Sequence, residues 1–148
     1  MKIIEKDITK ISEGIIAHQV NCFGRMGSGV AKSLSENFPK IKSEYVELCS
    51  NNRPESLLGT FQTVIINDKL KVLNCFSQLH YGKDGKLYTN YTSIDNIFGN
   101  ISKKFSEQLY LPFMYGCGLG GGDWNKIKAI IEDVFKHENL TVIEYDTN

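Results

Sequence analysis

The sequence of 148 residues lacks several features that mark particular classes of protein. Lys plus Arg and Asp plus Glu both number 17, so the formal net charge is zero and no basic run offers a surface for nucleic acid. No apolar stretch approaches the roughly 18 residues that span a bilayer, and charges interrupt residues 1–6, where a secretion signal would be apolar. Repeats and low-complexity tracts are absent. We expect a soluble, cytoplasmic protein with a small anionic ligand and no membrane partner.

Cysteine is present, but without the spacing of a cysteine site. Cys22, Cys49, Cys75 and Cys117 lie far apart and form no Cys-x-x-Cys pair. This argues against a zinc site and against the disulfide framework of a small secreted protein. We therefore expect a reducing compartment, and action without a metal or another cofactor.

Apolar periodicity predicts an alternation of strands and helices. Residues 14–20 are apolar almost throughout, as expected of a strand buried on both faces. Strands at 61–66 and 70–76 are joined by a polar turn and form a hairpin. The other predicted strands are 3–4, 109–114 and 140–145, and the predicted helices are 29–38, 40–49, 94–105 and 124–135. The pattern predicts one three-layer α/β/α domain with a mixed central sheet.

Two glycine-rich segments carry most of the functional information. Residues 25–30 read Arg-Met-Gly-Ser-Gly-Val, and residues 115–124 read Tyr-Gly-Cys-Gly-Leu-Gly-Gly-Gly-Asp-Trp. Each segment follows an apolar run and opens a helical pattern, where free backbone N–H groups and the helix dipole attract an anion. Both fall beyond the carboxyl ends of strands, where open α/β sheets bind ligands. Together they predict a diphosphate held from both sides.

These two segments, extended to residues 18–31 and 115–124, resemble the two phosphate loops of the macro domain family. The order of elements agrees over nearly the whole chain. The likeness is greatest to the branch of ADP-ribose 1''-phosphate phosphatases and ADP-ribosyl-glutamate hydrolases. It implies a single macro domain over 1–148, a monomer, that binds ADP-ribose or its 1''-phosphate and acts on an ADP-ribose derivative. ADP-ribosylated macromolecules are further partners that it implies.

The resemblance also implies site residues. Asp7 would accept a hydrogen bond from the adenine amino group, or else only cap a turn; Asn21 would face the distal ribose, or else close a turn. Tyr115 and Tyr145 would flank the distal ribose and the adenine, unless they only pack in the core. The implied ligand-binding residues are Asp7, Ile8, Asn21, Met26, Gly27, Ser28, Gly29, Val30, Tyr115, Gly116, Cys117, Gly118, Leu119, Gly120, Gly121, Gly122 and Tyr145.

Two residues are candidates for catalysis. His18 would orient water or protonate the leaving sugar oxygen, or else it is a buried histidine bonded to a backbone carbonyl. Asp123 would align water as a general base, or else it caps the helix that follows. Cys117 is better explained by tight packing than as a nucleophile, because the Cys-x5-Arg spacing of a cysteine phosphatase is absent. Arg25 either contacts a phosphate or is an exposed loop residue. His80 is a second histidine candidate in the loop 78–90.

The sequence departs from related branches at three positions. Gly24 stands where one hydrolase class carries a second asparagine, Gln78 where another carries a lysine, and Gly120 where that class carries its acidic partner. A lysine-based mechanism would need Lys83 or Lys86 to reach the site from loop 78–90. Two alternatives to a phosphatase therefore stand: a binding module without catalysis, and a hydrolase that removes ADP-ribose from a macromolecule.

Overall fold

The computed structural model describes residues 1–136 and 140–145, apart from the side chain of Tyr145. A six-stranded sheet with the order β1-β6-β5-β2-β4-β3 forms its centre. All neighbouring strands are parallel except β3 and β4, which form the predicted antiparallel hairpin. The sheet is therefore mixed, as predicted. Its strands are β1 (Lys2–Lys6), β2 (Gly14–Val20), β3 (Phe61–Ile65), β4 (Leu70–Phe76), β5 (Leu109–Pro112) and β6 (Leu140–Tyr145).

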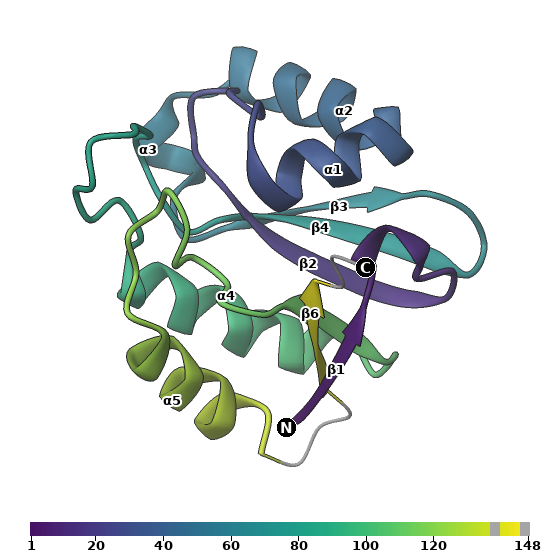
Figure 1. Ribbon diagram of the computed structural model, residues 1–148. Helices are drawn as coiled ribbons and strands as arrows, with labels where there is room; N and C mark the ends of the chain where they lie inside the picture. The colour runs from purple at the N-terminus through teal and green to yellow at the C-terminus, as the bar shows by residue number, and fades with distance from the viewer. Residues whose placement is uncertain (137–139, 146–148) are drawn as a thin grey trace.

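Helices cover both faces of the sheet. Figure 1 shows α1 and α2 on one face and α4 and α5 on the other, which confirms the three-layer α/β/α architecture. No described helix combines the length and the apolar character needed to cross a membrane. The helices are η1 (Ile8–Lys10), α1 (Gly29–Asn37), α2 (Pro39–Ser50), α3 (Pro54–Leu57), α4 (Tyr91–Lys104) and α5 (Trp124–Val134).

The central strand β2 is buried on both faces because its residues feed two apolar clusters. Ile15 and Ala17 belong to the cluster that packs against α4 and α5. Ile16 and Val20 point the other way and join the cluster beneath α1 and α2. Successive side chains of a strand alternate between faces, so an unbroken apolar run is the expected pattern for this position.

The structure corrects the predicted elements at a few places. The strand predicted over 109–114 ends at Pro112, and Met114 lies in a turn with a φ of 61°, a left-handed conformation that ends the strand. The short elements η1 and α3 were not predicted, because three or four residues carry no periodicity. The helix predicted from residue 94 begins three residues earlier, at Tyr91, where the Asn90 side chain accepts a hydrogen bond from the Ser93 N–H.

The parallel strands bring the ends of five strands to one edge of the sheet. β1, β6, β5, β2 and β4 all run in the same direction, so the segments that follow them meet there. The first glycine-rich segment follows β2, and the second follows β5. Because β2 and β5 are neighbours, the fold places the two segments next to each other.

Candidate functional site

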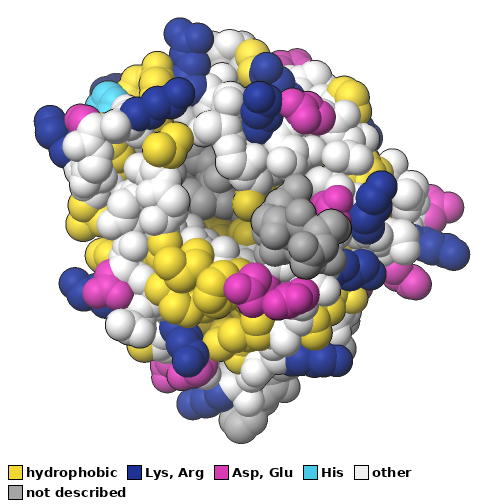
Figure 2. All heavy atoms as spheres, viewed as in Figure 1, with side chains coloured by type: hydrophobic (Ala, Val, Ile, Leu, Met, Phe, Trp, Pro, Cys, Tyr) yellow, Lys and Arg dark blue, Asp and Glu magenta, His cyan; other side chains and the backbone are white. Residues whose placement is uncertain are grey.

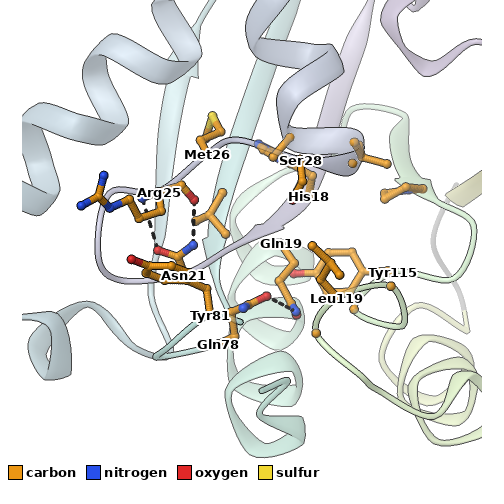
Figure 3. Close-up of a pocket in the computed structure, with 18 of the residues that line it drawn as sticks. His18, Gln19, Asn21, Arg25, Met26, Ser28, Gln78, Tyr81, Tyr115 and Leu119 are labelled. Carbon is orange, nitrogen blue, oxygen red and sulfur yellow. Dashed lines mark hydrogen bonds between the residues drawn. The ribbon is translucent and has the colours of Figure 1, made fainter. Parts of the chain in front are cut away.

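A cleft of about 680 Å³ opens between the two glycine-rich segments at this edge of the sheet. Figure 3 shows that its walls come from the end of β2, the start of α1, the segment after β4 and the turn after β5. Its lining consists of His18, Gln19, Val20, Asn21, Arg25, Met26, Gly27, Ser28, Gly29, Val30, Ala31, Gln78, Tyr81, Gly82, Lys83, Pro112, Phe113, Met114, Tyr115, Gly116, Gly118, Leu119 and Gly120.

The first glycine-rich segment leads into the N-terminus of α1. Ser28 is the N-cap residue, and its side chain makes no capping hydrogen bond. A Cβ atom added at Gly27 or Gly29 would meet no atom within 4 Å, and Gly29 has a φ of 61°. The backbone here is thus uncovered on the side of the cleft, and the N–H groups at the helix start are available to an anion.

Asn21 holds this segment in place. Its side-chain amide donates to the Arg25 carbonyl oxygen at 2.7 Å, and its side-chain oxygen accepts from the Phe23 N–H at 2.9 Å. The Tyr45 hydroxyl donates to the Asn21 carbonyl oxygen at 2.7 Å. The turn-closing role that the sequence left open for Asn21 is therefore present, and Asn21 lines the cleft as well.

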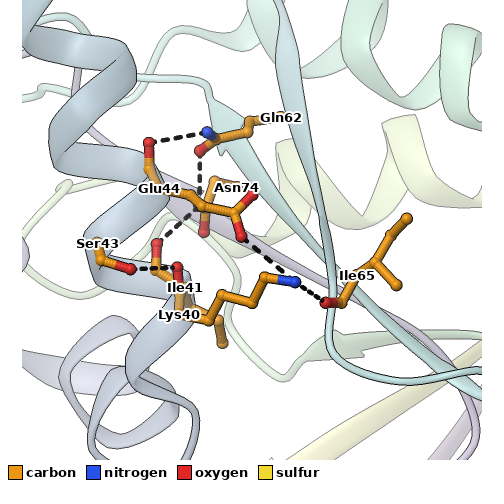
Figure 4. A network of polar contacts seen from close by, with 7 residues as sticks. All are labelled: Lys40, Ile41, Ser43, Glu44, Gln62, Ile65 and Asn74. Atoms are coloured by element: carbon orange, nitrogen blue, oxygen red, sulfur yellow. Dashed lines mark hydrogen bonds and ion pairs between the residues drawn. The ribbon is translucent and has the colours of Figure 1, made fainter.

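His18 lies on the floor of the cleft and is buried in a neutral form. Its Nε2 lies 2.6 Å from the Oδ1 of Asn74. The Asn74 amide nitrogen donates to Gln62 and to the Ile41 carbonyl, as Figure 4 shows, so Oδ1 is the acceptor and Nε2 of His18 carries the hydrogen. Burial lowers the pKa of His18 to about 4. The other nitrogen, Nδ1, has no hydrogen-bond partner among the described residues.

A buried polar network supports the second glycine-rich segment from below. Ser77 donates to the Gln19 side-chain oxygen at 2.6 Å and lies 2.8 Å from the Tyr115 hydroxyl. The Gln19 amide donates to Thr89 at 2.9 Å and to Gln78 at 2.8 Å, the latter bond drawn in Figure 3. Gln78, which stands where a related class carries lysine, is thus held at the cleft by another amide.

The glycines of the second segment serve two purposes. A Cβ at Gly118 would meet nothing within 4 Å, so this residue leaves space for a ligand. A Cβ at Gly120 would lie 2.5 Å from the Thr89 hydroxyl, and one at Gly122 would lie 2.7 Å from the Gly116 carbonyl oxygen. Most of these glycines are therefore required by packing within the protein, a role that the sequence could not separate from ligand approach.

A third segment, residues 77–90, completes the cleft between the other two. Its Gln78 and Leu79 carbonyl oxygens accept hydrogen bonds from Cys22, and its Thr89 N–H donates to the Gly120 carbonyl at 3.0 Å. The ring of His80 stacks on Phe23 with centroids 4.4 Å apart. Sequence reasoning identified this loop as functional, but only the structure brings it between both glycine-rich segments.

Some predicted site residues do not line the cleft. Asp7 caps η1, where its Oδ1 accepts from the Thr9 N–H at 2.9 Å and from the Thr9 hydroxyl at 2.6 Å. Asp123 caps α5 by accepting from the Asn125 N–H at 2.9 Å, the alternative left open by the sequence. The others outside the lining are Ile8, Cys117, Gly121 and Gly122, and the side chain of Tyr145 lies outside the described residues.

Cys117 has the properties of a packing residue. Its thiol donates to the Tyr115 carbonyl oxygen at 3.4 Å. Burial raises its pKa to about 11, so the nucleophilic thiolate is scarce near neutral pH. This agrees with the reading of Cys117 as a small residue in a tight loop.

The chain resembles known proteins over nearly its full length, although no family model matches it. It is 28% identical to an uncharacterised 17.5 kDa protein of Enterobacteria phage T4, over 99% of this chain and 97% of that protein. It is 24% identical to an ADP-ribose 1''-phosphate phosphatase of Candida albicans, over 87% of each chain. It is 22% identical to a DNA ADP-ribosyl glycohydrolase of Mycobacterium tuberculosis, of which it covers 37%.

Solved structures give the same result. A protein of unknown function from Bacteroides thetaiotaomicron superposes with a TM-score of 0.86 at 27% identity, over 97% of this chain and 96% of the other. The macrodomain of Mycobacterium tuberculosis DarG gives 0.79 at 19% identity, over 99% and 97%. Thermosipho africanus DarTG in complex with ADP-ribose gives 0.77 at 18% identity, over 96% of this chain and 40% of that one. The chain has the macrodomain fold, and the predicted resemblance is confirmed.

Proposed function

We propose that this macrodomain binds ADP-ribose in the cleft and hydrolyses ADP-ribose 1''-phosphate to ADP-ribose and phosphate. The observation that carries the binding half is the pair of glycine-rich segments on either side of one cleft, with the start of α1 directed into it. An uncovered helix N-terminus beside open glycines is suited to a diphosphate. The solved macrodomain complex with ADP-ribose and the distant phosphatases support the ligand class.

The sheet suggests how the ligand is oriented. Asp7 follows β1 and Asn21 follows β2, and the strand order places β6 and β5 between them. Three strand spacings of about 4.8 Å separate the two ends by roughly 14 Å, with the start of α1 on the path between them. We infer that the adenine lies toward Asp7, whose second carboxylate oxygen is not used by the Thr9 contacts, and that the distal ribose lies toward Asn21.

The chemistry proposed for the site is hydrolysis of a phosphomonoester. The oxygen of a water molecule bonds to phosphorus, the bond from phosphorus to the sugar oxygen breaks, and that oxygen leaves with a proton. Backbone N–H groups stabilise the charge on the phosphoryl oxygens. His18 is neutral with a low pKa, so the role we assign it is to accept a hydrogen bond at Nδ1 and orient a hydroxyl or water. It is not suited to be a general acid.

Phosphorus NMR tests the proposal directly. The protein is incubated with ADP-ribose 1''-phosphate, and the monoester and diphosphate resonances are followed together. We expect free phosphate to appear far faster than without protein while the diphosphate resonances stay intact. His18→Leu should slow this reaction while ADP-ribose affinity, measured by calorimetry, changes less than tenfold, about 1.4 kcal/mol. An intact monoester in the presence of a protein that binds ADP-ribose would reject the phosphatase.

A binding module without turnover is the second candidate function. It is favoured by the contents of the cleft, since among the described residues no Asp or Glu lines it and Gln78 replaces a lysine. Calorimetry with ADP-ribose, run beside the NMR assay, separates the two functions because only the enzyme shows both binding and release of phosphate. Removal of ADP-ribose from DNA or from protein glutamate is assayed in the same series with those conjugates as substrates.

A further inference from the structure

Two cations from different segments line the cleft without an acidic partner. Arg25 belongs to the first glycine-rich segment, and Lys83 to the segment that follows β4. Neither side chain forms an ion pair with any carboxylate among residues 1–136 and 140–145. Because the described lining contains no Asp or Glu, the cleft presents two positive charges and no side-chain negative charge. Such an arrangement favours a ligand with more than one negative charge.

Both cations lie toward the same end of the cleft. Arg25 comes four residues after Asn21, which directly follows β2, and Lys83 lies in the connection that leaves the neighbouring strand β4. Pro112 and Phe113, at the end of β5, line the cleft on the opposite side of β2. The two charges therefore belong to the end that we assign to the distal ribose, beyond the start of α1.

The backbone that carries each cation is fixed by neighbours. The Asn21 side chain bonds to the Arg25 carbonyl at 2.7 Å and contacts its N–H at 3.4 Å, which Figure 3 shows as dashed lines. In the segment after β4, the Tyr88 N–H donates to the Gly120 carbonyl at 2.8 Å and its hydroxyl donates to Asp84 at 2.8 Å. The side chains of Arg25 and Lys83 are left free while their loops are held, which is the arrangement of a recognition site.

Lys86 of the same segment differs from Lys83 in each of these respects. Its side-chain nitrogen lies 3.7 Å from the Asp84 carboxylate, its side chain is 77% exposed, and it does not line the cleft. Asp84 is thus occupied by Tyr88 and Lys86, and it leaves Lys83 unneutralised. The chain offers Lys86 as a matched control for charge removed from the same loop.

We infer that Arg25 and Lys83 form a second anion subsite, separate from the diphosphate cradle, that selects ligands with a phosphomonoester on the distal ribose. The inference rests on the proposed function for the placement of the ribose. Near pH 7 a phosphomonoester carries between one and two negative charges, and the two cations would contact it from opposite loops. ADP-ribose itself lacks that group, so the subsite distinguishes the substrate from its product.

The test compares two ligands across three variants. Lys83→Met, Arg25→Met and Lys86→Met are prepared, and affinity is measured by calorimetry for ADP-ribose. For ADP-ribose 1''-phosphate, KM is measured, or Kd where no turnover occurs. We expect Lys83→Met and Arg25→Met each to weaken the phosphomonoester about five- to tenfold and ADP-ribose less than twofold, with no change in Lys86→Met. The preference should shrink between 50 and 300 mM salt, because exposed charges are screened.

The outcomes separate this inference from the proposed function. Equal weakening of both ligands in Lys83→Met, or an equal effect in Lys86→Met, would overturn the subsite even if phosphate is released. A preference for the phosphomonoester that depends on both cations, without any release of phosphate, would support the subsite and reject the phosphatase. Circular dichroism and thermal unfolding confirm that each variant is folded.

Discussion

Asn74 accepts the Nε2 hydrogen of His18 across 2.6 Å, and this bond decides which imidazole nitrogen is left without a partner. The two residues are register partners on neighbouring strands β2 and β4. The Asn74 amide is committed to Gln62 and Ile41, so its oxygen can only accept. A histidine that sequence reasoning treated as a candidate acid is thereby held as a neutral group with its Nδ1 lone pair free.

The buried His18 should make stability depend on pH. Its folded pKa of about 4 lies below the ordinary value of 6.5, so between these values the unfolded chain binds a proton that the folded protein does not. The contribution is fully present above pH 6.5 and is lost as the pH falls toward 4, by about 3 kcal/mol. Urea unfolding at a series of pH values measures it.

His18→Leu is the control for this dependence. The variant removes the titrating group from the same buried position, so its unfolding free energy should fall less steeply between pH 6.5 and 4 than that of the parent. Proton NMR provides a second check, because the His18 ring resonance should not shift until the pH approaches 4. A His18 resonance that titrates near 6.5 would show that the imidazole is not buried as described.

Gly120 and Gly118 should respond differently to alanine. At Gly120 a Cβ would lie 2.5 Å from Thr89 and 2.8 Å from Gln19, and overpacking of this kind costs about 2 kcal/mol or more. At Gly118 the same atom meets nothing within 4 Å, so Gly118→Ala should keep its stability within about 0.5 kcal/mol. Gly118→Ala should still weaken ADP-ribose, because the added methyl group would occupy the cleft. Denaturation and calorimetry on both variants check this, and equal destabilisation would contradict it.

Asp123 can be tested by separating its capping role from its charge. Asp123→Ala should destabilise the protein by about 1 kcal/mol, since it removes the acceptor for the Asn125 N–H. Asp123→Ser keeps a capping oxygen, and we expect it to keep both stability and turnover, because Asp123 does not line the cleft. Loss of phosphate release in a stable Asp123→Ser protein would instead assign the carboxylate to water alignment.

Asp7 should contribute to adenine binding if the ligand lies as proposed. Asp7→Ser keeps an oxygen at the start of η1 but lacks the second carboxylate oxygen, so the turn should be preserved. We expect ADP-ribose to bind about tenfold more weakly, about 1.4 kcal/mol, and ribose 5-phosphate to bind unchanged. Competition calorimetry with both ligands measures the difference. Equal weakening of the two would remove Asp7 from the adenine end.

Much of the fold could be predicted from local pattern. The bounds of β2, β4 and β6 agree with the apolar runs 14–20, 70–76 and 140–145, because buried strands are apolar throughout and polar residues end them. The hairpin of β3 and β4 followed from its polar turn. Prediction failed at Met114, where a left-handed turn ends an apolar run, and at η1 and α3, which are too short for periodicity.

The sequence by itself determined the order of elements, the two glycine-rich segments at strand ends and the likeness to macrodomains, because each depends on residues close together in the chain. The tertiary structure decided the rest. It joined His18 to Asn74, 56 residues away, and so set the protonation of the imidazole. It also brought Lys83 into the cleft and left Lys86 outside, since only the path of the folded loop distinguishes two lysines three residues apart.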